Sequence, residues 1–206
     1  PGQTVCRDQR TITVDGVAMS NLDTDQWRQR TSAAFQDFAR FELRAQETVG
    51  VGHLPSVDDQ EAVSVALDAA GGSDVVATLA AGLDTELGRS FLGGRELSGG
   101  QWQKLALGRT MMRSDPLLLV FDEPTASLDA LAEHALFSRY AAQSRAMASQ
   151  VAAITLLISH RFSTVRMADR IIVLRDGEIA EQGAHEALIA ADGLYAELYR
   201  LQSASY

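Results

Sequence analysis

The sequence predicts an α/β fold with a mostly parallel core sheet and an inserted helical subdomain. Two continuous apolar runs, PLLLVFDEPT and AITLLISH, are typical of parallel strands that are covered on both faces. Predicted helices alternate with such strands, as in layered α/β proteins. Between residues 41 and 113 the chain changes to alanine-rich helical segments. We therefore expect a core subdomain made of residues 1–40 and 114–206, with a helical subdomain inserted at 41–113.

The first forty residues predict strands on either side of a short helix. TITVDGV is a β-branched strand that ends in an Asp15-Gly16 turn, and DTDQWRQR is a short helix with an acidic first turn. TSAAFQDF then reads as a strand that ends at Gln36.

The predicted helical subdomain contains two helices with clear end signals. SVDDQEAVSVALDAAG places Ser56 at the N-cap and Gly71 at the stop. In LSGGQWQKLALGRT, Ser98 and Gln101 form the pattern of a capping box, so a helix should begin near Gly99.

Gly99 and Gly100 are unusual in the first turn of that helix, because each costs roughly 1 kcal/mol relative to alanine. A bare helix N-terminus with a serine beside it can receive a phosphate. The plainer interpretation is a glycine-rich turn before a capped helix, and Ser-Gly-Gly taken alone favours that interpretation.

The second half of the chain predicts the rest of the layered core. The strand at 117–122 is bounded by Pro116 and Pro124, and a helix follows at about 129–147. After the AITLLISH strand, RIIVLRDGEIAEQG predicts a hairpin with a tight Asp176-Gly177 turn. Two helices near 184–191 and 193–202 complete the predicted elements.

Composition excludes several classes of protein. The chain has 206 residues, 46% of them hydrophobic, and its longest apolar runs, such as LLLVF, are far shorter than the ~20 residues of a membrane-spanning helix. The single cysteine, Cys6, allows no internal disulfide, and the N-terminus lacks an apolar signal core, so we expect a cytosolic protein. A net charge of -9 argues against direct nucleic-acid binding.

Polar side chains follow three of the predicted strands at the point where each strand ends. They are Gln36, the adjacent pair Asp122 and Glu123, and His160. Open α/β sheets bind ligands at the carboxyl ends of their strands. Asp122 could hold a hydrated Mg²⁺ while Glu123 orients or deprotonates a water. Taken singly, an acidic turn or a structural histidine would explain each residue as well, but four of them at three strand ends favour a site.

The order of the motifs carries a family resemblance. Gln36 in FQDF, LSGGQ at 97–101, LLLVFDEPT at 117–125, SLD at 127–129 and ISHR at 158–161 follow one another along the chain. This series resembles the nucleotide-binding domain of ATP-binding cassette (ABC) transporters, from about residue 11 to residue 202.

The resemblance implies a role for each motif residue in binding and hydrolysing ATP. It implies that Gln36 contacts Mg²⁺ and water and senses a transmembrane partner, and that Asp122 lies near the metal. It implies Glu123 as the general base and His160 as the switch histidine on the γ-phosphate. Ser98, Gly99, Gly100 and Gln101 would cap ATP held by an opposite cassette, and Asp129 would lie at the dimer interface.

The C-terminal part narrows the resemblance to exporters. Residues 158–202 are similar to the tail of ABC exporters, and TELGRSFLGGRELSGG at 85–100 resembles their X-loop region. By that resemblance the partners are a second cassette, identical or different, and a transmembrane domain contacted through the Q-loop and X-loop regions. The location would then be the cytoplasmic face of the membrane.

One expected motif is absent from the sequence. The G-x-x-x-x-G-K-[ST] loop cradles the phosphates of ATP, but the chain has no Gly-Lys pair, and its one lysine is Lys104. PGQTV resembles the strand before that loop, and CRDQRTITVDG resembles the segment after the helix of that loop. Three explanations are open: a segment left out of the sequence, a deliberate deletion, or a degenerate cassette. The first is favoured because every other motif is intact.

Two further functions compete with an ATP-hydrolysing exporter domain. The chain without this loop is expected to be inactive alone, and it would then be a module that only lends LSGGQ to the ATP site of a partner. A soluble ABC ATPase of DNA repair or translation is disfavoured by the exporter-like tail, the net acidity and the lack of a coiled-coil insertion. Trp102 is expected to pack at a solvent edge, and His53, His134 and His185 are expected at the surface.

Overall fold

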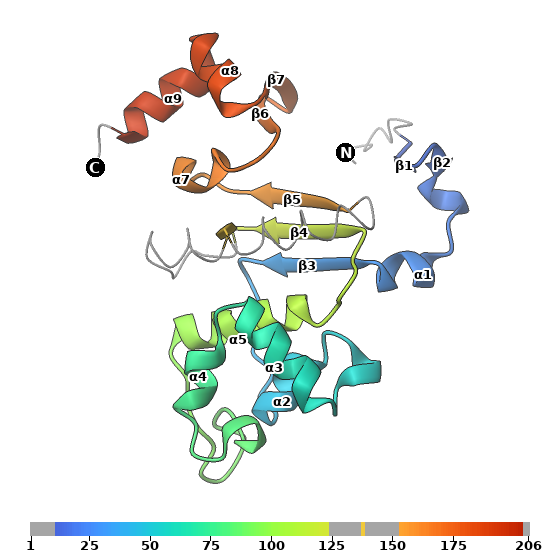
Figure 1. Ribbon diagram of the computed structural model, residues 1–206, viewed down its shortest axis with the longest axis vertical. Coiled ribbons are helices and arrows are strands. Elements are labelled where there is room, and N and C mark those ends of the chain that lie inside the picture. Colours follow the sequence, from blue (N-terminus) through green and yellow to red (C-terminus); the bar gives the residue numbers. More distant parts are fainter. Residues whose placement is uncertain (1–10, 124–136, 139–152, 204–206) are drawn as a thin grey trace, which may run out of the picture.

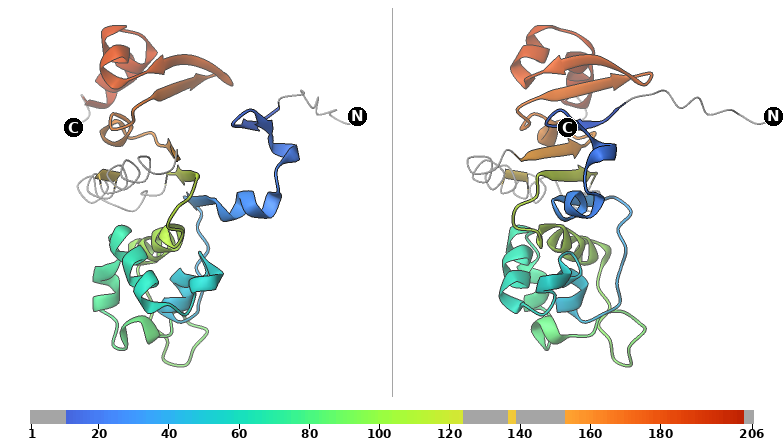
Figure 2. Two further views of the ribbon diagram at one scale, coloured as in Figure 1. Left: turned by 45° about the vertical axis from the view of Figure 1, so that its right-hand side comes forward. Right: turned by 90° about the vertical axis from the view of Figure 1, so that its right-hand side faces the viewer.

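A computed structural model of the chain describes residues 11–123, 137–138 and 153–203. Its centre is a three-stranded sheet in which β4 lies between β3 and β5, and both pairs are parallel (Figure 1). Figures 1 and 2 show helices α2–α5 on one side of this sheet. The β6–β7 hairpin lies on the opposite side with α8 and α9. Within the described residues, no helix is both long enough and apolar enough to span a bilayer.

The described strands are short and occur in three groups. Their bounds are β1 Thr13–Val14, β2 Val17–Ala18, β3 Thr31–Phe35, β4 Leu118–Asp122, β5 Ile154–Ile158, β6 Ile171–Arg175 and β7 Glu178–Gly183.

The described α-helices are also short, and the longest of them is α5. Their bounds are α1 Thr24–Gln29, α2 Ala45–Gly50, α3 Gln60–Ala69, α4 Ser73–Ala77, α5 Gly99–Met111, α7 Phe162–Val165, α8 His185–Ala190 and α9 Leu194–Ser203. Short 3-10 helices occupy Met19–Asn21, Leu54–Ser56 and Gly82–Asp84. The expected helix at 129–147 falls almost entirely outside the described residues.

The prediction of parallel core strands is confirmed, but the prediction that both apolar runs are covered on two faces is wrong for β5. In β4, Leu119 and Phe121 are buried and the other three residues are half-buried. In β5, Ile154 is 64% exposed, and Leu156 and Ile158 are each 46% exposed. The reason is that no described apolar cluster includes Ile154, Leu156 or Ile158, whereas Leu157 packs against the cluster that contains Phe121.

Helix α5 is fastened to β3 by two hydroxyl groups. The buried Ser32 hydroxyl donates to the carbonyl oxygen of Thr110 at 2.6 Å, and the Thr110 hydroxyl donates to the carbonyl of Ala33 at 3.1 Å. Leu107 of α5 is buried in the same apolar cluster as Phe121 of β4. The sheet and α5 therefore pack against each other through a shared apolar cluster.

On its other side α5 packs against α2 and α3 in a second apolar cluster. Trp102 is only 3% exposed in this cluster and lies with Leu105, so the expectation of a solvent-edge tryptophan is wrong. The first-turn glycines suggest an open helix end, but Trp102 points toward the core one residue after the capping box. Lys104, also on α5, forms an ion pair with Asp74 of α4.

The N-terminus of α3 differs from the prediction, and its C-terminus agrees with it. Ser56 ends a 3-10 helix, and the N-cap of α3 is Asp59, whose carboxylate accepts from the amides of Glu61 and Ala62 at 3.0 Å each. The Asp59 carboxylate accepts from two amides at the start of α3. Ser56 belongs to the preceding 3-10 helix and so lies three residues before the cap position. Gly71 follows the helix with φ of +65° and ends it as expected.

Both predicted Asp-Gly turns are present. Asp15-Gly16 and Asp176-Gly177 have positive φ at both residues and connect the antiparallel pairs β1–β2 and β6–β7. The two C-terminal helices are also confirmed as α8 and α9. The expectation of surface histidines is not met by His53 and His185, which are half-buried. The His53 ring lies 3.0 Å from the Ser56 hydroxyl, and the His185 ring packs against the rings of Tyr195 and Tyr199. His134 lies outside the described residues.

The corrected cap of α3 leads to a stability prediction. Asp59→Ala should lower the free energy of unfolding by about 1 kcal/mol, because two helix-end amides lose their acceptor. Ser56→Ala is the matched control and should cost much less. Urea unfolding followed by circular dichroism measures both values, and an equal or larger loss for Ser56→Ala would restore Ser56 as the cap.

Candidate functional site

The candidate site lies at the carboxyl edge of the parallel sheet. Phe35 of β3, Asp122 of β4 and Ile158 of β5 are in register across the three strands. The residues that follow these positions therefore leave the sheet at the same edge. The register places Gln36 one residue beyond the Phe35–Asp122 pair, and it brings Glu123 close to the segment that carries His160.

The most direct contact at this edge joins Glu123 and His160. The distance from Glu123 Oε1 to His160 Nδ1 is 2.8 Å, although the residues are 37 positions apart. The Glu123 side chain is 30% exposed and the His160 side chain is 67% exposed. Because an ionised carboxylate only accepts hydrogen bonds, this contact places the hydrogen on Nδ1. The opposite ring nitrogen, Nε2, is left for another partner.

The backbone of Glu123 has an uncommon conformation. Its φ is +44°, in the left-handed region that side chains other than glycine seldom adopt. Its amide donates to the carbonyl oxygen of Ile158 at 3.0 Å, which continues the pairing of β4 with β5 by one residue. The chain therefore turns sharply at Glu123, and such local strain is concentrated at functional positions.

Asp122 and Gln36 occupy the neighbouring strand ends. Asp122 is half-buried and Gln36 is exposed. In the part of the chain that the structure describes, no three His, Cys, Asp or Glu side chains gather as they would around a metal ion. Mg²⁺ commonly takes one or two carboxylates and completes its shell with waters and phosphate oxygens. The carboxylate of Asp122 and the amide of Gln36, at neighbouring strand ends, are ligands of the kind that suit such an ion.

The capping box at the start of α5 is present as predicted. The Ser98 amide donates to Gln101 Oε1 at 2.9 Å, and the Gln101 amide donates to Ser98 Oγ at 3.3 Å. A Cβ added to Gly99 or Gly100 would meet no atom of the chain within 4 Å. The two glycines are therefore not required by the packing of this chain, and they leave the backbone of the first turn accessible.

The structure does not bring the whole predicted set together. Among the described residues, the cap of α5 shares no hydrogen bond or ion pair with Gln36, Asp122, Glu123 or His160. Asp129 lies outside the described residues.

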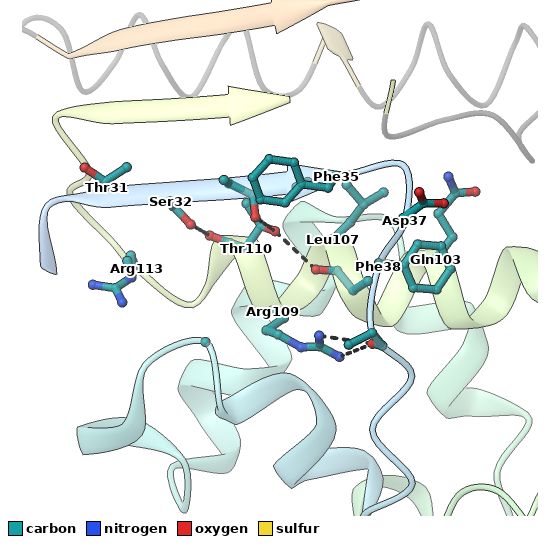
Figure 3. Close-up of a pocket in the computed structure, with 15 residues that line it drawn as sticks. Thr31, Ser32, Phe35, Asp37, Phe38, Gln103, Leu107, Arg109, Thr110 and Arg113 are labelled. Atoms are coloured by element: carbon teal, nitrogen blue, oxygen red, sulfur yellow. Dashed lines mark hydrogen bonds between the residues drawn. The ribbon is translucent and has the colours of Figure 1, made fainter. Parts of the chain in front are cut away.

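An open groove lies between β3 and α5. Its volume is about 280 Å³, and Figure 3 shows Asp37, Phe38, Gln103, Leu107 and Arg109 along its walls. The Arg109 guanidinium donates to the carbonyl of Ala39 through both terminal nitrogens at 3.2 Å and to the carbonyl of Thr48 at 3.0 Å.

Sequence reasoning missed Arg109, which lies two turns beyond the LSGGQ motif. Its guanidinium also stacks over the Phe41 ring at 4.2 Å, and burial lowers the pKa of Arg109 to about 10. A basic residue within an apolar helix face was the only available signal. Arg109 fixes the segment that follows Gln36 onto α5.

Glu42, in the segment that follows Gln36, is bound to the loop at 88–96. The amide and the hydroxyl of Ser90 both donate to Glu42 Oε2, and the hydroxyl bond lowers the pKa of the Glu42 carboxyl below its ordinary value. A Cβ on Gly88 would collide with the Glu42 side chain, and Gly88 has φ of +91°. Residues 39–42 are therefore held by α5 on one side and by this loop on the other.

The open surroundings of the two glycines lead to a second stability prediction. Gly99→Ala and Gly100→Ala should each raise the free energy of unfolding by up to about 1 kcal/mol, because alanine is the better helix former. Gly108→Ala on the same helix is the control and should bring no such gain, since its Cβ would lie 3.1 Å from Leu67 Cδ2. Urea unfolding measures all three, and a loss at Gly99 or Gly100 would show that the chain's own fold needs the glycine.

Comparisons with known proteins agree on one family. The family model described as ABC transporter matches residues 3–126. The ATP-dependent lipid A-core flippase of Burkholderia orbicola (strain AU 1054) is 40% identical over 192 residues, which is 93% of this chain and 30% of that protein. The subtilin transport ATP-binding protein SpaT of Bacillus subtilis is 35% identical over 187 residues, covering 91% of this chain and 29% of that protein.

A solved structure gives the same answer for the fold. A bacterial Atm1-family ABC exporter with ATP bound matches with a TM-score of 0.78 and 34% identity, over 93% of this chain and 32% of that chain. The chain thus spans about a third of the length of the relatives that it matches. The strand-end residues, the capped glycine helix and these matches lead to one conclusion: the chain belongs to the ABC transporter family, as the ATP-binding cassette of an exporter.

Proposed function

We propose that the parent protein hydrolyses ATP to drive export across a membrane, and that this chain contributes the residues at the carboxyl edge of its sheet to that reaction. The observation that carries the proposal is the Glu123–His160 hydrogen bond, formed where parallel strands of an α/β sheet bind ligands. The ABC relatives named above, which include a structure with ATP bound, support ATP as the ligand.

At the reacting phosphate, Glu123 acts on the attacking water and His160 contacts the γ-phosphate. With Oε1 engaged by His160, the other carboxylate oxygen of Glu123 orients a water and takes a proton from it as the water attacks the γ-phosphorus. The imidazole, fixed through Nδ1, contacts the γ-phosphate through Nε2. Asp122 and Gln36 hold Mg²⁺, which when bound neutralises charge on the phosphate oxygens.

The start of α5 serves the ATP of a second cassette. Ser98, Gly99, Gly100 and Gln101 present a bare helix end to the γ-phosphate of that ATP, in a head-to-tail dimer that closes on binding and reopens after hydrolysis. Asp129 lies at the interface in this arrangement. The accessible backbone at both glycines supports this role.

The open edge of β5 is where we place the strand that leads into a phosphate-binding loop. Such a loop must reach the phosphates beside Glu123 and His160, so its strand should run parallel to β5 and end at the same edge. The exposed Ile154, Leu156 and Ile158 support an additional covering element there. The sequence has no Gly-Lys pair and therefore lacks this loop, so the chain alone does not hydrolyse ATP.

The transmembrane partner contacts the surface formed by residues 36–42 and the loop at 85–96. Phe41 is partly exposed and Leu92 is fully exposed on these segments. The link between Glu42 and Ser90 joins the two segments into one surface. We place this surface, and so residues 41–113 as a helical subdomain, against the transmembrane domain at the cytoplasmic face of the membrane.

The second candidate function is a module that binds no nucleotide and only lends its LSGGQ motif. The absence of a Gly-Lys pair from the sequence favours it.

A mixing experiment tests the role of the α5 N-terminus in trans. The partner is the cassette of the Burkholderia orbicola flippase with its own signature serine replaced by arginine, which leaves its phosphate-binding loop without a functional opposite motif. Adding this chain should restore ATP hydrolysis by roughly 100-fold, the scale of removing or restoring one preorganised hydrogen-bond donor. Ser98→Arg should abolish the rescue.

The control for the mixing experiment is Ser64→Arg, the same change at an exposed serine of α3. It should rescue as well as the unmodified chain. No rescue by the unmodified chain, or rescue by Ser98→Arg, would reject the role in trans.

A restored loop distinguishes the enzyme from the module. Inserting the phosphate-loop segment of the flippase between Val5 and Thr11 should raise the melting temperature, because it covers apolar surface of β5, and should produce ATP hydrolysis. Differential scanning fluorimetry and phosphate release measure the two effects. The same insert with its loop lysine changed to alanine should keep the stability gain and lose hydrolysis. An insert that folds and binds ATP without hydrolysis would favour the module.

A further inference from the structure

The segment that carries His160 is held from the far end of the chain by Gln202 of α9. The Gln202 side-chain amide donates from Nε2 to the carbonyl oxygen of His160 at 3.2 Å. Its Oε1 accepts from the amide of Phe162 at 3.0 Å. One side chain therefore fixes the backbone on both sides of Arg161.

Two tyrosines on α9 hold the same segment. The Phe162 ring meets the Tyr195 ring edge-on with centroids 5.2 Å apart, and the Tyr199 ring in the same way at 5.5 Å. Tyr195, Tyr199 and Gln202 follow the i, i+4, i+7 spacing of a single helix face. That face of α9 is therefore directed at residues 160–162.

This support adds to the few local bonds of the segment, such as the one from the Arg161 amide to the Ser159 hydroxyl oxygen at 3.0 Å. Helix α7 has four residues, and its N-cap Arg161 makes no side-chain capping bond. Gln202 Oε1 instead accepts from the first amide of the helix. The His160 side chain is mostly exposed, so its orientation depends on Glu123 at the ring and on Gln202 at the backbone.

We propose that Gln202 is a positioning residue, through which α9 holds the His160 backbone so that the ring meets Glu123. The value of this arrangement for ATP hydrolysis rests on the proposed function. The arrangement itself is a property of this chain without nucleotide, and it is tested in that form.

The test uses the chain with ¹⁵N-labelled histidine and a uniformly labelled sample for amide exchange. In mildly alkaline buffer, the ring ¹⁵N shifts of His160 should show hydrogen on Nδ1. In Gln202→Met, this form should cease to be the major tautomer, and the Phe162 amide should exchange about tenfold faster, as expected for the loss of one hydrogen bond.

His185 reports whether α9 remains docked in the variant. Its Nδ1 lies 2.9 Å from the Tyr195 hydroxyl, so its signals should change only if the helix moves away. Arg200→Gln is the matched control, because Arg200 is on the same helix but pairs with Asp192, and it should leave the His160 signals unchanged.

Gln202→Glu separates the two hydrogen bonds. Glutamate keeps an acceptor for the Phe162 amide but places a carboxylate against the His160 carbonyl, so Phe162 should stay protected while the His160 shifts change. If His160 keeps its wild-type shifts in Gln202→Glu, the proposal is wrong. The same holds for Gln202→Met with His185 unchanged. If Gln202→Met undocks α9, the Gln202→Glu result decides alone. If the chain passes this test but neither rescues the flippase cassette in the mixing experiment nor hydrolyses ATP with the loop inserted, the proposed function is rejected and this inference is left intact.

Discussion

The parallel pairing of β4 with both β3 and β5 is the constraint on which the rest of the structure depends. A strand paired on both edges must satisfy two ladders at once, so its register determines where both neighbours end. That register places Gln36, Asp122, Glu123 and His160 at one edge, although 124 positions separate the first residue from the last. It also fixes β3, and through the hydroxyl bonds of Ser32 and Thr110 it fixes the direction of α5.

Local signals in the sequence were sufficient for the elements that end in strong stops or caps. The Asp-Gly turns, the Ser98 capping box and the α9 helix follow from interactions within a few residues, and all are present. The strand-end residues could be predicted as a group because parallel strands share an edge. The order of the motifs along the chain then indicated the ABC family, which no single residue could indicate.

Most of the missed features depend on distant packing. The Asp59 cap is an exception, because its two bonds are local and Ser56 was simply the wrong choice between nearby cap residues. Buried Trp102 and exposed β5 reflect which neighbour lies alongside, and periodicity does not contain that information. Arg109 contacts residues 61 and 70 positions away, and Gln202 contacts residues 40 and 42 positions away. Neither side chain belongs to a recognisable motif, so its role becomes visible only after the chain is folded.

Helix α5 has a tightly packed body and an accessible first turn. Its buried face joins two apolar clusters through Leu105 and Leu107, which favours a rigid and well-packed helix. Its first turn has glycines that the packing does not require. Rigidity in the body of the helix allows an accessible end to keep a fixed direction, so the packing of Trp102 and Leu105 supports the exposed turn before them.

The place of Lys104 on α5 has a practical consequence. Lys104 carries the single lysine amine of the sequence, and Cys6 carries the single thiol. An amine-reactive dye will therefore modify α5 at one side-chain position, three residues after the capping box, while a thiol-reactive dye modifies a different part of the chain. In these 206 residues the two side chains are therefore a pair of orthogonal attachment points for fluorescence energy transfer.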